Sequence, residues 1–498
     1  MSQPTHVPVT RTVPLGSPHG AGHTAGVEVS AVRSVRLVDG TLADLLVADG
    51  HITAVLSAAV RPTGTARPAG TVRPTGAAGV GVELDATGWR ALPAASEPHA
   101  HLDKALSGER VDYFSGTTGN DLSAAIEQWR GLLSTIDEAD VRDRATRAVE
   151  RYVARGITSI RTHVDFPLTG DPLRGLKALT AVRDALAGVM TIQVVGLAGQ
   201  HTDDAVLADA VSLGLDVIGG CPHISEDPHR ETTRMLDLAE RTGLPVDLHT
   251  DEQTSAHELD IVDLAHQVIA RDLGQLVTAS HCVRLGSLPP EQLRPVLDLV
   301  ARSGMGIVTL PITNLYLQGW DATHLAPRGL TAVRAILDAG IPLAAGADNL
   351  RDPFNPVGRA DPFETTSLLI TAGHLTPVEA LAAVTTGART VLGLPAVLDA
   401  GPGRAAAPGT LDPGTPVAAD LVLVPDVDLG DVLAGAVDAR VVLHAGRVLA
   451  DSRVSRTLAL PTSPHLTSTA SAATRTAPNR STQDPAGTPD RPVLEHVR

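Results

Sequence analysis

Strand-like and helix-like segments alternate through the middle of this chain, and that alternation limits the folds available to it. Eight runs rich in β-branched and apolar residues are separated by segments with apolar residues at helical spacing. About 300 residues with eight such units is the size of a (β/α)8 TIM-type barrel, an α/β fold; an open doubly wound sheet is the alternative. The strand-like runs are the one ending at residue 99 and those at 158–165, 191–197, 216–219, 245–249, 276–281, 306–310 and 342–348, with helix-like runs at 138–154, 205–213, 231–242 and 330–339.

Short β-type runs flank this central segment on both sides. Runs at 35–38, 45–48 and 52–56 are separated by Asp-Gly pairs, which are strong hairpin signals, and similar runs return at 420–424, 439–443 and 446–449. We therefore expect a small β-sandwich domain built from both chain ends, 26–90 and 406–454, with the barrel at 91–405 inserted between them. A loop rich in Pro and Gly is expected near 58–80, and disordered tails are expected at 1–25 and 455–498.

Composition narrows the environment and the partners. The net charge is −16 and aromatic residues make up only 2%, which disfavours nucleic-acid and anionic-membrane partners. No run of 18 apolar residues occurs, and the first 25 residues contain no apolar stretch typical of a signal peptide. With two cysteines among 498 residues there is no disulfide framework, so a cytoplasmic location is expected.

The sequence His99-Ala100-His101 lies at the end of the first strand-like run. Side chains alternate faces along a strand, so these two imidazoles point to the same side and can close on one divalent ion. The pair is weak evidence by itself, because the chain contains 19 histidines.

Other strand-like runs also end in polar residues of metal-binding or acid–base type. In a barrel the carboxyl ends of the strands meet at one mouth, so residues far apart in sequence converge there. Imidazoles together with a carboxylate suit Zn²⁺ or Fe²⁺ without any thiolate. The residues concerned are His163 with Asp165, His249 with Asp251 and Glu252, His281, and Asp348 with Asn349.

Several of these residues also have a purely structural interpretation. Asp348 could cap the following helix. His249 could be a core histidine, although Asp251 and Glu252 beside it argue against an apolar core, and His281 next to Cys282 is open to either interpretation. His163 and Asp165 are expected to be a structural pair that stabilises the mouth. His223 and Glu226 follow the fourth run, and no role is assigned to them.

Taken together, these motifs resemble the amidohydrolase superfamily and, within it, the cytosine deaminase branch. The resemblance covers roughly residues 30–450 and extends to the split β-domain. It rests on residues 97–103 (EPHAHLD), 161–165 (RTHVD), 249–252 (HTDE), 279–281 (ASH), 314–319 (NLYLQG) and 348–354 (DNLRDPF).

The resemblance implies a role for each of these polar residues. His99, His101, His249 and Asp348 would bind one divalent metal, Zn or Fe(II). His281 would act with Asp348 on the bound water, and Glu252 would move a proton to the substrate and to the departing ammonia. Binuclear relatives carry a carboxylated lysine after the fourth strand. Residues 216–225 contain no lysine here, which favours one metal.

Three positions expected to bind substrate depart from the cytosine-specific pattern. Gln200 lies one position late for the family's substrate-binding glutamine, Lys104 replaces a threonine, and Phe354 replaces a tryptophan. Lys104 is either a surface residue with an extended stem or a hydrogen-bond donor to a substrate carbonyl. These changes concern the substrate pocket and leave the metal ligands intact.

The resemblance therefore implies a metal-dependent hydrolytic deaminase of a cyclic amidine, acting on a small nitrogen heterocycle. Cytosine or a related pyrimidine is the leading substrate; an N-substituted triazine, a creatinine-like ring and another cyclic amide are the rivals. A catalytically silent scaffold is the alternative from a different class. Family members are often oligomeric, so a homo-oligomer is compatible with the resemblance.

Overall fold

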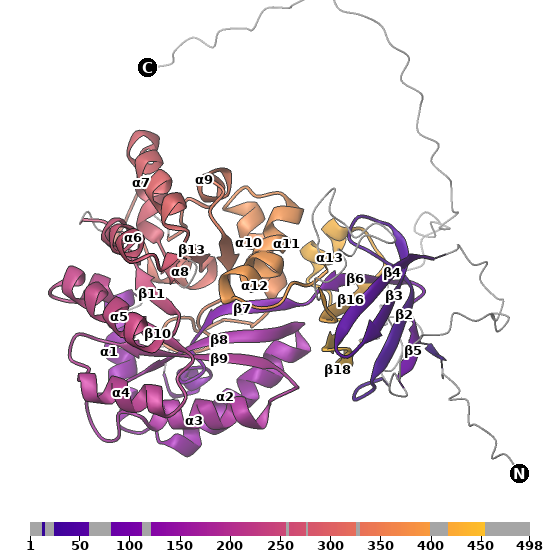
Figure 1. The fold of residues 1–498 in the computed structure, drawn as a ribbon, viewed down its shortest axis with the longest axis horizontal. Helices are drawn as coiled ribbons and strands as arrows, with labels where there is room; N and C mark the ends of the chain where they lie inside the picture. Colours follow the sequence, from indigo (N-terminus) through magenta and orange to yellow (C-terminus); the bar gives the residue numbers. More distant parts are fainter. Residues whose placement is uncertain are drawn as a thin grey trace, which may run out of the picture. The chain divides into compact units, whose positions relative to one another are not determined.

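A computed structural model of the chain describes residues 12–14, 24–58, 81–111, 121–254, 258–274, 277–324, 329–398 and 417–453. These residues form two hydrogen-bonded sheets (Figure 1). The predicted C-terminal tail, the predicted boundary at 405/406, and most of the N-terminal tail and of the loop near 58–80 lie outside the described residues.

Eight parallel strands form the first sheet, and they follow one another in sequence order. A bridge between Ala100 and Asp348 joins the end of the first strand to the turn after the last, so the sheet is a nearly closed barrel. This confirms the predicted (β/α)8 fold over the open doubly wound alternative. The strands are β7 (Ala95–Ala100), β8 (Ile157–Asp165), β9 (Thr191–Ala198), β10 (Val217–Gly220), β11 (Val246–Thr250), β12 (Val277–His281), β13 (Gly306–Thr309) and β14 (Leu343–Ala345).

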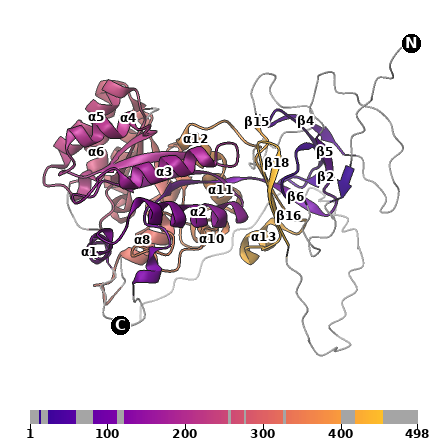
Figure 2. The same cartoon turned by 90° about the horizontal axis from the view of Figure 1, so that it is seen from below.

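Helices surround this barrel, with α2 and α3 side by side in Figure 2. They are α1 (Leu122–Leu133), α2 (Glu138–Ala154), α3 (Arg174–Ala185), α4 (Asp204–Ser212), α5 (Pro228–Thr242), α6 (Asp260–Arg271), α7 (Pro290–Ser303), α8 (Pro311–Leu317), α9 (Val333–Asp338), α10 (Pro362–Thr371), α11 (Pro377–Val384) and α12 (Thr386–Leu392). The predicted helix at 138–154 has the bounds of α2, and the other three predicted helices overlap α4, α5 and α9.

Helix α5 shows how the sequence sets an element of this outer layer. The Asp227 side chain accepts a hydrogen bond from the Arg230 backbone N–H at the start of the helix, and Gly243 ends it with a φ of 72°. Met235 and Leu236 lie on the buried face that packs towards the barrel.

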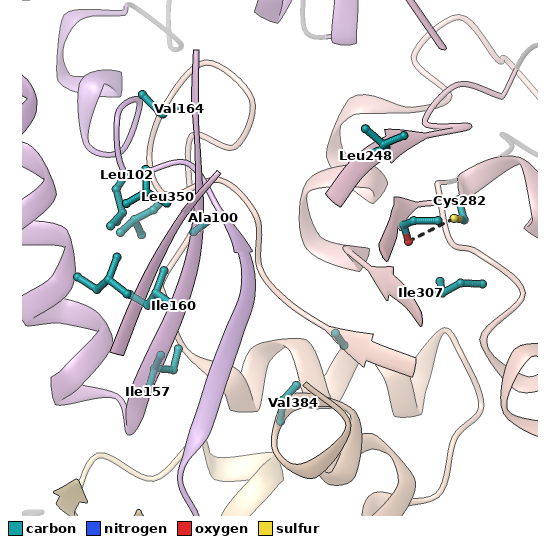
Figure 3. Packing of buried hydrophobic residues seen from close by; sticks show 14 of the residues in the cluster. Ala100, Leu102, Ile157, Ile160, Val164, Leu248, Cys282, Ile307, Leu350 and Val384 are labelled. Carbon is teal, nitrogen blue, oxygen red and sulfur yellow. Dashed lines mark hydrogen bonds between the residues drawn. The ribbon is translucent and has the colours of Figure 1, made fainter. Parts of the chain in front are cut away.

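One apolar core runs between the strands and the helices. Figure 3 shows Leu102 beside Leu350 near the end of β7, and Leu248 and Ile307 on the opposite side of the barrel. All four side chains are almost completely buried. The barrel strands are therefore apolar on the outside, and the inward positions at their carboxyl ends are left to polar residues.

The second sheet is mixed, has ten strands, and draws them from both chain ends, around a separate apolar core. Both Asp-Gly hairpins are present, and the β3–β4 turn places Asp49 and Gly50 at positive φ, as a tight hairpin turn requires. The strands are β1 (Thr12–Pro14), β2 (Val29–Arg36), β3 (Leu42–Ala48), β4 (His51–Ser57), β5 (Val82–Asp85), β6 (Trp89–Pro93), β15 (Val417–Ala418), β16 (Leu421–Pro425), β17 (Arg440–His444) and β18 (Arg447–Ser452), with the helix α13 (Leu429–Gly435) between β16 and β17.

Two details differ from the sequence-based domain description. Strand β1 pairs with β5, so the predicted disordered tail contains a hydrogen-bonded strand. Strand β6 pairs with β16 along its whole length and crosses the predicted boundary at 90/91, because its ladder continues to Pro93. A buried ion pair between Arg440 and Asp361, at 2.8 Å, links β17 to the start of α10.

Candidate active site

Four predicted metal ligands meet at the carboxyl end of the barrel. His99 Nε2 lies 3.2 Å from His249 Nε2, and His101 Nε2 lies 3.3 Å from Asp348 Oδ1. His99 Nε2 and Asp348 Oδ1 are 3.9 Å apart, and all four side chains are buried. Residues separated by up to 249 positions are therefore held within one small volume.

The chemistry of this cluster fits a divalent cation. Burial lowers the pKa of His99, His101 and His249, so these rings are neutral and each has one bare ring nitrogen that can bind a cation. Asp348 Oδ1 is buried and has no hydrogen-bond partner among the described residues. A buried carboxylate oxygen without a partner is unfavourable unless a cation neutralises it, and imidazole with carboxylate is a donor set that Zn²⁺ and Fe²⁺ accept.

The backbone around Asp348 is shaped to deliver that carboxylate. Asp348 has a φ of 67°, an uncommon conformation for a residue with a side chain. Just before it, a Cβ on Gly346 would lie 2.0 Å from Glu97 Oε1, so only glycine fits there. Glu97 accepts a hydrogen bond from the Ala347 backbone N–H, and this contact ties the turn to β7.

A second group of polar side chains surrounds Glu252, just after β11. His281 Nδ1 lies 3.7 Å from Glu252 Oε1, and His223 Nε2 lies 3.5 Å from Glu252 Oε2. Asn314 is 3.0 Å from His281 Nδ1, and Gln318 donates to the backbone oxygen of Glu252. Burial raises the pKa of Glu252, but the positive charges available to His281 and His223 outweigh it, and the net pKa lies below the usual value.

His223 was given no role by the sequence, yet it borders both groups. Its Nδ1 is 3.0 Å from the backbone oxygen of His249, which fixes the ring, and its Nε2 faces Glu252. It lies in the short 3-10 helix Pro222–Ile224, directly after β10. The rule that polar residues at strand ends converge could therefore have found it.

The expected pair of His163 and Asp165 does not form. The His163 ring packs against His99 with 3.9 Å between ring centroids, and neither of its nitrogens has a hydrogen-bond partner among the described residues. Asp165 instead bonds to Lys104 and Trp129. Side chains two positions apart on β8 share a face, but they lie at different depths of the barrel. His163 therefore belongs to the histidine cluster and Asp165 to the wall above it.

Above the metal cluster the barrel opens into a cavity of about 470 Å³. His101, His249, His281, Asp348 and Glu252 border its inner end. Side chains of α1 and of the loops after β8 and β10 form an apolar outer part: Leu122, Ile126, Trp129, Leu133, Phe166, Pro167, Leu168 and Ile224.

Lys104 also borders the cavity, but it is only 3% exposed, so the interpretation as a surface lysine is wrong. Its Nζ lies 3.1 Å from His101 Nδ1, 2.8 Å from Asp165 Oδ1 and 3.6 Å from Asp103 Oδ2. Two of its hydrogen-bond donors are used by His101 and Asp165, and Asp103 adds a longer ion-pair contact. Lys104 is thus placed to hold its neighbours in position.

Gln200 and Phe354 border the cavity as well. The Gln200 side-chain oxygen accepts a hydrogen bond from the Glu226 backbone N–H at 2.6 Å, so this oxygen already has a partner. Phe354 is 9% exposed and presents an aromatic surface near Asn349. The three predicted substrate-binding residues therefore border the same cavity. They differ in how many of their polar groups already have partners within the protein.

Comparison with known proteins agrees with this geometry. The model described as "Amidohydrolase family" matches residues 125–450. The chain belongs to the amidohydrolase family. This family consists of metal-dependent hydrolases that act on carbon–nitrogen bonds. Two groups in the cluster could hold a metal ion, His99 with His163 and His249, and His99 with His281 and Asp348. Among the described residues of this amidohydrolase, no helix combines the length and apolar character needed to cross a bilayer.

Individual relatives act on small nitrogen heterocycles. The chain is 30% identical over 415 residues to the pterin deaminase of Rhizobium rhizogenes, a match that covers 82% of this chain and 87% of that protein. The structure of the Klebsiella pneumoniae 5-methylcytosine deaminase liganded with 5-fluorocytosine superposes with a TM-score of 0.69 at 26% identity, covering 87% of this chain and 100% of that one. The Burkholderia multivorans N-isopropylammelide isopropylaminohydrolase gives 0.67 at 26% identity, covering 85% and 98%.

Proposed function

We propose that this amidohydrolase is a hydrolytic deaminase that replaces the amino group of a heterocyclic amidine by oxygen and releases ammonia. The observation that carries the proposal is the placement of Glu252 between His223 and His281, beside the converging metal ligands and at the inner end of the cavity. A carboxylate held next to a metal-activated nucleophile is the arrangement that a proton transfer to a ring nitrogen needs.

In this proposal His99, His101, His249 and Asp348 hold one divalent ion. When bound, such an ion makes water acidic enough to supply a nucleophile near neutral pH. The lysine-free end of β10 supports a single ion. The four ligand atoms converge from β7, β11 and the turn after β14, so few adjustments are needed to close them on it.

The chain's own residues then handle the protons. Glu252, whose pKa lies below its usual value, rests as a carboxylate, accepts a proton from the attacking water and passes it to the ring nitrogen and to the leaving amine. His281 Nε2 is buried without a partner among the described residues, so it is free to bond to that water. Asn314 and the backbone at a φ of 71° hold the His281 ring in place.

The cavity supports a substrate larger than cytosine. A volume of about 470 Å³ is in the range of pockets that enclose ligands much larger than a single pyrimidine ring. Its outer part is apolar and lies against α1, so it suits a second fused ring better than open water. The likeness to the pterin deaminase favours a pterin, with cytosine and an N-substituted triazine as the comparison substrates.

The test is amine release by purified protein loaded separately with Zn²⁺ and Fe²⁺, measured as ammonia from pterin and cytosine and as isopropylamine from N-isopropylammelide. We expect pterin to be deaminated with a higher kcat/KM than cytosine or N-isopropylammelide. Absence of ammonia from the whole panel would overturn the deaminase proposal, and a preference for cytosine would overturn only the choice of substrate. Metal analysis separates a silent scaffold, since a deaminase of this kind retains close to one ion per chain.

A further inference from the structure

The opening of the cavity carries an arginine that the proposed chemistry does not use. Arg130 lies on α1 one turn after Ile126 and two turns after Leu122, and all three side chains border the cavity. Residues four apart lie on the same side of a helix, so Arg130 belongs to the face of α1 that forms the cavity wall. Arg130 is exposed, whereas Lys104 and Glu252 in the same lining are buried. Its guanidinium therefore lies at the outer end of the cavity.

This guanidinium has no acid to pair with. Among the described residues, Arg130 takes part in no hydrogen bond and no ion pair. Asp165, the partly exposed acid of the cavity wall, is already bonded to Lys104 and Trp129. The other exposed residues of the described lining include no acid; they are Leu168, Thr169, Gly199, His201 and Ile224. The planar fork of N–H donors on Arg130, which matches a carboxylate or a phosphate, is therefore available to a ligand.

A second donor borders the cavity from the loop after β9. The Gln200 side-chain oxygen accepts from the Glu226 backbone N–H at 2.6 Å, and this contact fixes which end of the amide is oxygen. The Gln200 amide nitrogen, which can only donate, then lies 3.2 Å from His201 Nε2. In the neutral ring Nε2 is therefore the acceptor, and Nδ1 carries the hydrogen. His201 is exposed, and this N–H has no partner among the described residues.

The inner end of the cavity has the opposite character. Glu252 and Asp348 are buried acids there, beside the position of the reacting amidine in the proposed function. Of the two lysine and arginine side chains in the described lining, Lys104 is buried and already bonded to its neighbours, so only Arg130 is left for a ligand. The whole chain has a net charge of −16, so local donors must supply any attraction for an anion at the opening. The cavity thus orients a ligand that is basic at one end and anionic at the other.

We infer that Arg130 and His201 bind an anionic substituent of the substrate, a carboxylate or a phosphate, at the end remote from the amino group that is removed. This inference rests on the proposed deaminase function and names the class of heterocycle that the function serves. In a fused ring such as pterin, carbon 6 lies in the ring that does not bear the amino group, so a substituent there extends towards the opening. Neither residue belongs to the motifs by which the chain resembles the cytosine deaminase branch.

The experiment measures kcat and KM for ammonia release from three pterins that differ only at carbon 6: the carboxylate, the neutral hydroxymethyl compound and its phosphate ester. We expect metal-loaded wild type to favour an anion over the neutral compound by roughly three- to tenfold in kcat/KM, as for an exposed ion pair with hydrogen bonds. R130M should lose most of this preference through a higher KM with little change in kcat, because the anion is bound alike before and during the reaction. The larger of the two anionic preferences distinguishes a carboxylate from a phosphate.

Further variants separate binding from a structural effect. Arg130 lies in the last turn of α1, where a positive charge also suits the helix dipole, but that role would change stability and not a ratio of substrates. R130K keeps the charge without the planar fork and should retain part of the preference, and H201F should lose a smaller part than R130M. R142M, at an arginine of α2 that is 52% exposed, is the control and should leave the ratios unchanged. Raising the NaCl concentration should weaken the preference in wild type and not in R130M.

Equal use of the anionic and neutral pterins by wild type, or a preference that survives in R130M, would overturn the role of Arg130 while leaving the deaminase intact. Ammonia from cytosine but from none of the pterins would have the same meaning. Absence of ammonia from the three pterins and from cytosine would instead overturn the proposed function together with this inference.

Discussion

Two buried polar clusters lie inside the same barrel, one layer apart, and they are satisfied in opposite ways. In the deeper cluster Arg161 bonds to Asp247 at 2.9 Å, and Ser280 donates to the other oxygen of Asp247 at 2.6 Å. In the upper cluster His99 Nδ1 and Asp348 Oδ1 are buried and have no hydrogen-bond partner among the described residues. The first cluster is complete within the chain, whereas the second requires something the chain does not contain.

This difference distinguishes buried polar groups that stabilise the barrel from buried polar groups that are available to a ligand. Both clusters use inward positions of β8 and β11, two residues apart along each strand. Burying charge is tolerable in the deeper layer because opposite charges and hydroxyls meet. In the upper layer the buried polar groups lack such partners, and binding a cation would offset the unfavourable free energy of burying them. Mutations in the two layers should therefore affect different measurements.

The largest effect is expected from E252Q, which alters the chemistry above the metal ligands without removing a ligand. We expect kcat to fall by about 10²- to 10⁴-fold, because the amide cannot move a proton. Metal content should remain that of wild type, as measured by elemental analysis beside the ammonia assay. E226Q, in the exposed loop after β10, is the control. Unchanged turnover in E252Q would remove Glu252 from the mechanism.

R161M should disrupt the deeper cluster of Arg161, Asp247 and Ser280. It should lower the free energy of unfolding more than any substitution of a single predicted metal ligand. Removing one partner leaves Asp247 buried without its cation, and we expect the free energy of unfolding to fall by about 3–5 kcal/mol. Urea unfolding of metal-loaded protein measures it. R147M, on the exposed side of α2, is the matched control. A loss below about 1 kcal/mol would mean that the deeper cluster is not structural.

D348N should stabilise metal-free protein, whereas R161M should destabilise the protein. Replacing the carboxylate by a neutral amide removes a charge that is buried without a cation in metal-free protein, so the free energy of unfolding in the presence of a chelator should rise by about 1–3 kcal/mol. The same variant should no longer retain metal after dialysis. If metal-free D348N were less stable than metal-free wild type, the polar groups of the upper cluster would be satisfied within the chain, without a cation.

The smallest effect is expected at the surface, where water replaces lost partners. Glu379 belongs to the capping box of α11, and hydrogen bonding to Arg334 lowers its pKa to about 2. A lowered pKa contributes stability above the unfolded value of about 4.5 and loses it as the pH falls towards 2. E379Q should therefore cost at most about 1 kcal/mol at pH 7, given solvent screening, and less at pH 3. Urea titrations at the two pH values check this, and a difference that grew on acidification would contradict it.

Much of the barrel could be predicted because its signals are local. The bounds of α2 match the predicted helix because its apolar spacing lies within the helix and its capping residue, Asp137, directly precedes it. The hairpin at Asp49-Gly50 was readable for the same reason. The predicted domain boundary at 90/91 falls inside β6, because the last residues of this strand pair with β16, more than 300 positions away in the sequence.

The candidate site shows the same division. Residue type and position at strand ends predicted a group of polar candidates at the barrel mouth, and the choice of His99, His101, His249 and Asp348 as ligands and of Glu252 as proton carrier came from the resemblance to the amidohydrolases. The interpretation of His163 and Asp165 as a pair was wrong. Their spacing predicts that both side chains share a face of β8, but it does not predict how deep in the barrel each one lies or which neighbours it contacts. The sequence left Lys104 open between a surface residue and a donor to the substrate, and only its contacts with Asp165 and His101 show that it is buried.

The sequence by itself determined the order of strands and helices, the donor set for a cation and the acid beside it, because these depend on periodicity and on the chemistry of single residues. Only the fold settles which of those polar groups find a hydrogen-bond partner within the chain. It joins Arg161 to Asp247, and it leaves Asp348 Oδ1 buried without a partner among the described residues. The physical reason is that hydrogen-bond satisfaction is a property of neighbours in space, which the closure of the barrel brings together.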